Sequence, residues 1–269
     1  MIVTDLDGTL LNSEQKISEY TKNIVNHFIE RGGLFTYATA RSYSSASKLT
    51  ACLNIRLPIA AYNGAFLVEH STGRVLEACT FDKEKISGLL AALEQSSIKP
   101  LVYAFVDGLE RVSWISGEET SGITNYLNSR IGDKRLRPAT SYEELFAGDI
   151  FHMNIIGTKA ETDDVRGLFD GNSHVYYHVQ EDIYTGEFWL EALRYDATKE
   201  QSVMKLKKLI GAEKVIVFGD NINDIPMFRC SDECYAVENA KDELKRIATG
   251  IIRSNDNDGV AKWMKENLL

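Results

Sequence analysis

Disulfide scaffolding is missing from this sequence of 269 residues, which contains only four cysteines. Four cysteines are too few for a disulfide framework in a chain of this length, and no signal-peptide pattern opens the sequence. No run of about 18 apolar residues occurs, so we expect no transmembrane helix. Cys230 and Cys234 invite a metal interpretation, but no second Cys or His pair stands at zinc spacing. We interpret both as core thiols.

An excess of positive charge is also missing. Lys and Arg number 30 against 39 Asp and Glu, and the formal net charge is -9. Duplex nucleic acid is bound by clustered Lys and Arg, so we expect no nucleic-acid partner. A small anionic substrate is compatible with this charge, because it needs only a local positive site. The hydrophobic fraction of 44% is typical of a globular chain, and a chain of this length can bury a core without disulfide crosslinks.

Internal repeats, low-complexity tracts and Pro- or Gly-rich linkers are absent as well, so the domains must be inferred from hydrophobic patterns. Apolar runs alternate with helical segments in residues 1–81 and 190–269, which is typical of a doubly wound parallel sheet with helices on both faces. Residues 82–189 alternate with a period of two, which is typical of an antiparallel or mixed sheet with one wet face. We predict an α/β core (1–81 and 190–269) with an inserted α/β domain (82–189).

Four aspartates follow two apolar runs of the predicted core. Asp5 and Asp7 lie at the end of "MIVTDLD", and Asp220 and Asp224 lie at and after the end of "KVIVFGD". Ligands of open α/β sheets bind at the carboxyl ends of the strands, near the switch in strand order. If the two strands are neighbours, the four carboxylates meet in one crevice.

A crevice with four carboxylates needs protons or a cation, because the four groups cannot all stay ionised unopposed. Carboxylate and water oxygens are the ligands that Mg²⁺ prefers. A cation there also offsets the repulsion between a carboxylate nucleophile and a phosphoryl group. A single D-x-D or G-D pattern is more often a turn. The two patterns together, both at strand ends, favour the metal-dependent interpretation.

These motifs carry a family resemblance. "DLDGTLL" resembles the first motif of the haloacid dehalogenase superfamily of phosphohydrolases, and "GDNIND" resembles its fourth motif. Together with "IAAYNGA", "ENA" and "NDNDGVAKWM", they resemble the Cof-type sugar-phosphatase branch. The resemblance covers about 1–80 and 190–269. It implies that the middle of the chain is a cap domain inserted between the second and third motifs.

The resemblance implies a role for each residue of the first motif. In such enzymes the first Asp is a nucleophile, so Asp5 is expected to form an aspartyl-phosphate. Asp7 is expected to protonate the leaving oxygen and then to accept a proton from the attacking water. The phosphonate and haloacid branches lack this second Asp, so its presence favours phosphate esters. Gly8 is expected beside the substrate, where it permits the sharp exit from the strand, and Thr9 is expected to brace that exit.

The second motif of the superfamily is a Ser or Thr that ends the next strand, and "TYATAR" offers Thr39. Its hydroxyl and nearby backbone N–H groups are expected to hold a phosphoryl oxygen. The branch usually has A-T-G-R, whereas Ala40 replaces the Gly here, and a positive φ at Ala40 would be strained. Arg41 is expected either to contact phosphate or to be solvated, and both remain open.

The third motif is a Lys near a helix start, and "YDATKEQSV" offers Lys199. Its ammonium is expected to keep Asp5 ionised and to neutralise phosphoryl oxygens. The branch usually has Gly or Ser after this Lys, so Glu200 is a departure. Asn223 is expected to touch the substrate phosphate or to orient its loop. For Asn63, in "YNGA", a phosphate contact and a turn or hinge role are both open.

The expected metal ligands are Asp5, Asp220 and the backbone carbonyl of Asp7, with Asp224 close by or acting through water. In the middle of the chain the sequence assigns no specificity residues. His174 and His178 would share a face of a predicted strand, as a substrate contact or as a solvated pair. Other polar residues near the return to the core could line the cap, namely Glu181, Asp182, Tyr184 and Glu187.

From these features we predict a cytoplasmic, Mg²⁺-dependent phosphatase of small phosphate monoesters, such as sugar phosphates or related metabolites. We expect a monomer or a weak homodimer without a nucleic-acid or membrane partner. One alternative is a phosphomutase, which would need phosphate-gripping arginines in the cap, and the arginines there are scattered. The other is a non-catalytic sensor of phosphorylated metabolites.

Overall fold

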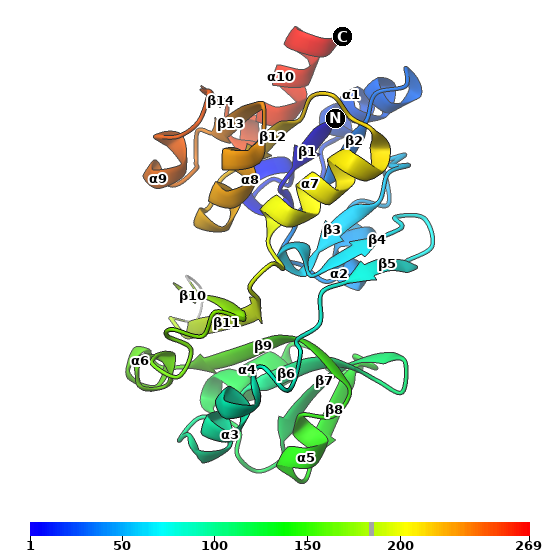
Figure 1. The fold of residues 1–269 in the computed structure, drawn as a ribbon. Coiled ribbons are helices and arrows are strands. Elements are labelled where there is room, and N and C mark those ends of the chain that lie inside the picture. Colours follow the sequence, from blue (N-terminus) through cyan, green and yellow to red (C-terminus); the bar gives the residue numbers. More distant parts are fainter. Residues whose placement is uncertain (183–185) are drawn as a thin grey trace. The chain divides into compact units, whose positions relative to one another are not determined.

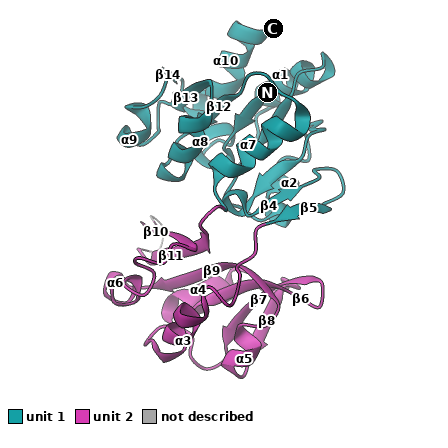
Figure 2. Ribbon diagram, viewed as in Figure 1, with its two compact units in different colours: residues 1–78, 197–269 teal, residues 79–196 magenta. Residues whose placement is uncertain are grey.

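The computed structural model describes residues 1–182 and 186–269, which form two compact units. Unit 1 consists of Met1–Ala78 and Ala197–Leu269, and unit 2 of Cys79–Asp196 (Figure 2). The predicted insert ended earlier, at residue 189. The difference arises because strand β11 (Phe188–Arg194) is hydrogen-bonded on both sides to strands of unit 2. Among the helices of the described residues, none is long and apolar enough to cross a membrane.

Unit 1 is built on a parallel sheet with the strand order β14-β13-β12-β1-β2 (Figure 1). Its strands are β1 (Ile2–Thr4), β2 (Phe35–Tyr37), β12 (Ile216–Gly219), β13 (Glu233–Val237) and β14 (Gly250–Ile252). The order reverses at β1, since β2 lies on one side of it and the later strands lie on the other. The crevice beside such a switch point is where ligands of this fold bind.

Helices cover both faces of this sheet, because successive residues of its buried strands point to opposite sides. The helices of unit 1 are α1 (Glu19–Glu30), α2 (Tyr43–Leu49), α7 (Lys199–Ile210), α8 (Ile225–Cys230), α9 (Asp242–Lys245) and α10 (Gly259–Leu268). Val217 of β12 packs in one cluster with Val203 of α7 and Met227 of α8. The next residue, Phe218, contacts Trp263 of α10, with ring centroids 5.1 Å apart. The predicted doubly wound core is confirmed.

After β2 the chain forms a small antiparallel sheet instead of extending the parallel sheet. Strand β3 (Ile59–Ala61) makes a single parallel bridge to the main sheet, between Ala38 and Ala60. It pairs along its length with β4 (Phe66–Val68), which pairs with β5 (Val75–Ala78) in a small antiparallel sheet. A tight turn joins β3 to β4, and such a turn permits antiparallel pairing without a crossover helix. β4 and β5 together form a hairpin.

Unit 2 contains a six-stranded sheet with the order β10-β11-β9-β6-β7-β8. Besides β11, its strands are β6 (Leu101–Val106), β7 (Leu109–Ile115), β8 (Leu136–Ala139), β9 (Asp149–Gly157) and β10 (Val175–Glu181). Only the β7–β8 pair is parallel within the described residues. The sequence left an antiparallel and a mixed sheet open for the middle of the chain, and the sheet is mixed.

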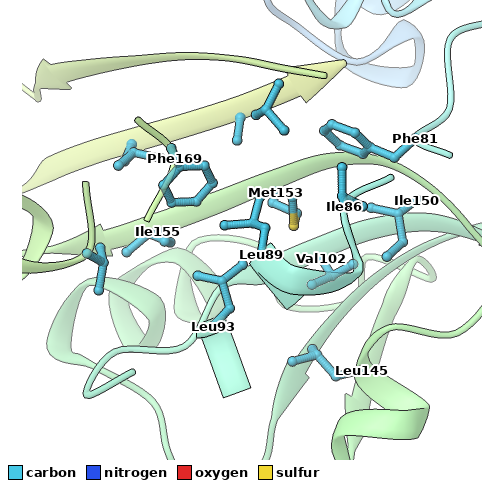
Figure 3. Packing of buried hydrophobic residues seen from close by; sticks show 14 of the residues in the cluster. Phe81, Ile86, Leu89, Leu93, Val102, Leu145, Ile150, Met153, Ile155 and Phe169 are labelled. Carbon is cyan, nitrogen blue, oxygen red and sulfur yellow. The ribbon is translucent and has the colours of Figure 1, made fainter. Parts of the chain in front are cut away.

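The helices of unit 2 are α3 (Ser87–Gln95), α4 (Ser121–Asn128), α5 (Tyr142–Leu145) and α6 (Lys159–Arg166). One face of the sheet packs against α3, α5 and α6 through a continuous apolar cluster. Leu93 of α3, Met153 of β9 and Phe169 lie in this cluster, and each is almost completely buried (Figure 3). Unit 2 therefore has a hydrophobic core of its own.

Candidate active site

The carboxyl ends of β1 and β12 lie side by side, because the two strands pair in register up to Thr4 and Phe218. Asp5 follows β1 directly, and its backbone N–H donates to the Phe218 carbonyl at 2.9 Å. Asp220 follows the last residue of β12. Carboxylate oxygens of Asp5, Asp220 and Asp224 all lie within 4.8 Å of one another. Three of the four predicted carboxylates therefore form one cluster at the switch point.

The chain leaves β1 through a tight turn, Leu6–Leu10, in which Asp7 and Gly8 are not helical. Gly8 within it has φ of +70°, a left-handed conformation that favours glycine. A Cβ at Gly8 would lie 2.5 Å from Oδ2 of Asp220, so the site also requires the absence of a side chain. The hydroxyl of the next residue, Thr9, donates to Oδ1 of Asp220 at 3.0 Å. This turn therefore fixes Asp220 as well as Asp5.

Lys199 connects two members of the cluster. Its Nζ donates to Oδ1 of Asp5 at 2.7 Å and to Oδ1 of Asp224 at 2.6 Å. Lys199 is 1% exposed, and Asp224 is fully buried. A buried ammonium is tolerated only where carboxylates pair with it, so these contacts define the position of the Lys199 side chain.

The start of α7 places Lys199 at the cluster. The Thr198 hydroxyl accepts a hydrogen bond from the Gln201 N–H at 3.2 Å, which makes Thr198 the N-cap and Lys199 the first helical residue. Gly64 packs against this cap, since a Cβ there would lie 2.3 Å from the Thr198 carbonyl oxygen. The turn after β3 thus supports the helix that carries the ammonium.

The electrostatics of the cluster are dominated by burial and by like charges. Burial raises the pKa of Asp5 well above its usual range, with Lys199 acting against the rise and Asp224 and Asp220 adding to it. Burial, followed by the charge of Asp224, raises the pKa of Asp220 to about 7. Burial disfavours the charged form of Lys199, but Asp224 and Asp5 outweigh it and raise the Lys199 pKa. One ammonium therefore does not neutralise three carboxylates.

A divalent cation fits this cluster on two grounds. The donors are carboxylate oxygens, which Mg²⁺ prefers. Burial, with the neighbouring carboxylates adding to it, raises the pKa values of Asp5 and Asp220, and a bound cation would oppose that rise. Asp224 is the member least available as a direct ligand. Its Oδ2 accepts hydrogen bonds from the N–H groups of Asp220, at 2.9 Å, and Asn221, at 3.1 Å, while Lys199 occupies Oδ1.

The side chain of Asp7 is directed to a different partner from Asp5. Nε of Arg41 donates to Oδ2 of Asp7 at 2.7 Å, and Nη2 donates to Oδ1 at 2.6 Å. These hydrogen bonds raise the pKa of the Arg41 guanidinium above its usual value. Thr39 is 1% exposed, and its hydroxyl accepts a hydrogen bond from the Arg41 N–H at 3.1 Å. Ala40, between them, is exposed and is not among the positive-φ residues, so the strain considered for it does not arise.

Asn63 and Asn223 contact each other near the cluster. Nδ2 of Asn223 donates to Oδ1 of Asn63 at 3.0 Å. Asn63 belongs to a run of three positive-φ residues, Tyr62–Gly64, which fits a turn role. Oδ1 of Asn223 is buried and has no hydrogen-bond partner within the described residues, as expected for a group that meets a ligand.

Unit 2 contains buried polar residues, of which His152 and Asn154 were not singled out from the sequence. His178 and Asn154 stand opposite Glu191 on its two neighbouring strands. Nε2 of His178 and Nε2 of His152 lie 3.7 and 3.9 Å from Oε2 of Glu191. Burial lowers the pKa of His152 to about 4. His174 precedes β10, with its ring against Tyr195, and Tyr184 lies outside the described residues.

Comparisons with known sequences give consistent matches. The profile of the haloacid dehalogenase-like hydrolases matches residues 2–264. The 5-amino-6-(5-phospho-D-ribitylamino)uracil phosphatase YwtE of Bacillus subtilis (strain 168) is 28% identical, over 99% of this chain and 97% of its own length. The pyridoxal phosphate phosphatase YbhA of Escherichia coli (strain K12) is 25% identical, over 100% of this chain and 98% of its own length.

Solved structures match the fold over the full chain. TM0651 from Thermotoga maritima has a TM-score of 0.80 at 22% identity and covers 100% of this chain and 97% of its own. A haloacid dehalogenase-like hydrolase from B. subtilis has a TM-score of 0.77 at 21% identity and covers 100% and 99%.

Proposed function

The chain belongs to the haloacid dehalogenase-like hydrolases, and from this premise we propose that it is a Mg²⁺-dependent phosphatase of small phosphate monoesters. The proposal depends chiefly on one observation. Lys199 pairs with Asp5 at 2.7 Å inside a cluster of carboxylates at the switch point of the sheet. Phosphoryl transfer through a covalent intermediate requires a nucleophilic carboxylate, an ammonium and a group of carboxylates suited to a cation.

In the proposed first step, the carboxylate of Asp5 attacks phosphorus. The bond from phosphorus to the ester oxygen breaks, and Asp7 gives its proton to that oxygen, so that the alcohol leaves neutral. The enzyme then holds an aspartyl-phosphate at Asp5. The contact of Lys199 with Asp5 supports this assignment, because the ammonium also offsets charge on the phosphoryl oxygens that approach.

In the proposed second step, a water molecule attacks phosphorus. Asp7 takes a proton from this water as the bond between phosphorus and Asp5 breaks. Inorganic phosphate leaves, and both aspartates return to their starting forms. The Thr39 hydroxyl and the side chain of Asn223 are proposed to hold phosphoryl oxygens. Oδ1 of Asn223 is buried and has no partner in the described part of the chain, which supports this role. Gly8 and Asn63 are proposed to border the same space.

The cation is proposed to bind to Asp5, Asp220 and the backbone carbonyl of Asp7, with Asp224 supporting the site through its hydrogen bonds. When bound, Mg²⁺ supplies positive charge that offsets the repulsion between the carboxylates and the phosphoryl group. Asp224 keeps Lys199 in place and orients the chain at Asp220 through the Asp220 N–H.

The proposed substrates are small metabolites with a phosphate on an alkyl hydroxyl, such as sugar phosphates. Support comes from two relatives named for phosphoesters of small polar molecules, one a ribitylamino-uracil phosphate and the other pyridoxal phosphate. We also propose a cytoplasmic location and a monomer or weak homodimer, which size-exclusion chromatography with light scattering tests.

Phosphate release from p-nitrophenyl phosphate, pyridoxal 5′-phosphate and glucose 6-phosphate tests the proposal. Each ester is assayed with Mg²⁺ or EDTA, using the wild type, Asp5→Asn and a matched control, Asp164→Asn, at an exposed position on α6. We expect release that requires Mg²⁺, that Asp5→Asn abolishes and that Asp164→Asn leaves intact. Folded wild type that binds these esters without releasing phosphate would favour a sensor. Transfer of phosphate to a second hydroxyl would favour a mutase.

A further inference from the structure

Most N–H donors of the Arg41 side chain already bond to protein groups, so few remain for a phosphate. A guanidinium has five N–H donors. Two of them are used by Asp7, and a third, on Nη2, donates to Oε1 of Gln15 at 2.8 Å. A fourth, on Nη1, donates to Oγ of Ser45 at 3.1 Å. Binding a phosphoryl group through Arg41 would therefore require this network to break.

The network is fixed from several elements of unit 1. The Arg41 N–H donates to Thr39, and the Arg41 carbonyl accepts from the N–H of Tyr62 at 3.0 Å, so the backbone on either side of the side chain is held. Gln15 has φ of +57°, an uncommon conformation for this residue type, and its N–H donates to the Asn12 carbonyl. The turn that presents Gln15 is thus a defined structure.

The bidentate contact sets the orientation of one particular carboxylate. Both oxygens of Asp7 accept from Arg41, at 2.6 and 2.7 Å, and such paired contacts fix the plane of a carboxylate in a way that a single donor does not. Asp7 remains 46% exposed in its side chain, so it stays open to a substrate while Arg41 holds it.

We infer that Arg41 is a positioning residue, which acts through Asp7 and does not contact the phosphate. It holds the Asp7 carboxyl in the plane from which the proton passes to the ester oxygen, and it pairs with the carboxylate that remains after that transfer. This inference rests on the proposed function. It replaces the phosphate contact that the sequence left open for Arg41.

The two possible roles of Arg41 predict different patterns of loss in kcat/KM across a series of esters. A phosphate contact is common to every ester, so its loss lowers kcat/KM by the same factor for all of them. Proton donation matters little when the leaving group is a weak base and matters greatly when it is a strong one. Loss of Arg41 should therefore lower kcat/KM by a factor that grows with the basicity of the leaving group.

A series of substituted phenyl phosphates, from p-nitrophenyl to phenyl and p-methoxyphenyl, tests this. We compare kcat/KM for wild type, Arg41→Lys and Arg41→Ala, with Ser45→Ala as a control that removes one contact of Arg41 but leaves the Asp7 pair. The loss in Arg41→Ala should be at least about tenfold larger for phenyl than for p-nitrophenyl phosphate. Arg41→Lys, which cannot make the bidentate contact, should show the same trend more weakly, and Ser45→Ala should show none.

Two further readouts separate the interpretations. In an Asp7→Asn background, Arg41→Ala should cause no additional loss for phenyl phosphate, because a residue that acts through Asp7 has nothing left to position. The inhibition constant for inorganic phosphate should be unchanged in Arg41→Ala. Equal losses across the series, weaker phosphate inhibition or additive losses in the double variant would overturn the inference, provided that circular dichroism shows folded variants.

The failure of this inference can be told from the failure of the proposed function. Wild type that releases no phosphate from any ester in the series would overturn both. Active wild type with a uniform loss in Arg41→Ala would overturn the positioning role alone.

Discussion

The ammonium of Lys199 lies 2.7 Å from Oδ1 of Asp5, and neither side chain is open to solvent to any large extent. Lys199 has the same relationship to Asp224, at 2.6 Å. The buried ammonium of Lys199 thus connects Asp5, the expected nucleophile, to Asp224. Asp224 in turn accepts a hydrogen bond from the Asp220 N–H at the end of β12. Under the proposed function, the Lys199 ammonium also offsets charge on an anionic substrate.

Lys199→Met should be severe for both activity and stability. The substitution keeps the length of the side chain but leaves two buried carboxylates without their partner, which costs about 3 kcal/mol of folding free energy. Activity should fall by about 10²–10³ in kcat, the size of effect seen when one group that stabilises transition-state charge is removed. Urea unfolding and phosphate release measure the two effects.

The control for Lys199→Met is Lys208→Met on the same helix, where the side chain is exposed. It should change neither quantity appreciably. A Lys199→Met protein with activity within a few-fold of wild type would contradict the role given to this ammonium.

Gly8→Ala should weaken Mg²⁺ binding through contact with Asp220. Gly211→Ala provides a matched control, since Gly8 and Gly211 both have φ of +70° but only a Cβ at Gly8 would meet neighbouring atoms. Both variants should lose about 1 kcal/mol of stability from the left-handed conformation. Only Gly8→Ala should raise the Mg²⁺ concentration needed for half-maximal activity, by about tenfold, as Asp220 is displaced. Equal Mg²⁺ dependence in the two variants would contradict the close approach.

Unit 2 should lose stability below neutral pH because of His152. Its pKa in the folded protein is about 4, against an ordinary value of 6.5, because burial disfavours the charged ring. Between these values the unfolded chain binds a proton that the folded chain does not, so stability falls as pH falls from 6.5 toward 4. From pH 7 to pH 5 the loss should be about 2 kcal/mol.

The measurement uses a Trp263→Phe background. The chain has three tryptophans, and the other two, Trp114 and Trp189, lie in unit 2 and report on it alone. Urea unfolding followed by their fluorescence should show the pH dependence, and His152→Gln should reduce it. An unchanged slope in His152→Gln would show that other groups cause it.

Much of the core could be predicted from the sequence, because its buried strands are short apolar runs that end at polar residues. The runs before Asp5 and Asp220 fix where the strands stop, and parallel pairing then brings the two aspartates together. Lys199 could be placed because the start of its helix is marked by Thr198, a residue that caps helices.

Features that depend on loop geometry could not be predicted in the same way. Nothing in the pattern around Gln15 indicates its positive φ or its contact with Arg41, because both arise from the fold of the turn around it. The pairing of β3 was also unpredictable from hydrophobicity. A buried run fits a parallel or an antiparallel neighbour equally well, and here the turn at Tyr62–Gly64 decides.

Covalent trapping of the intermediate tests the central claim most directly. The enzyme is mixed with p-nitrophenyl phosphate and Mg²⁺, stopped during the first turnover with acid, and treated with borohydride, which reduces an acyl phosphate to the alcohol. Peptide mass spectrometry should find residue 5 converted from aspartate to homoserine, and the conversion should be absent without substrate. Turnover that leaves Asp5 unmodified, or conversion at another carboxylate, would contradict an aspartyl-phosphate at Asp5.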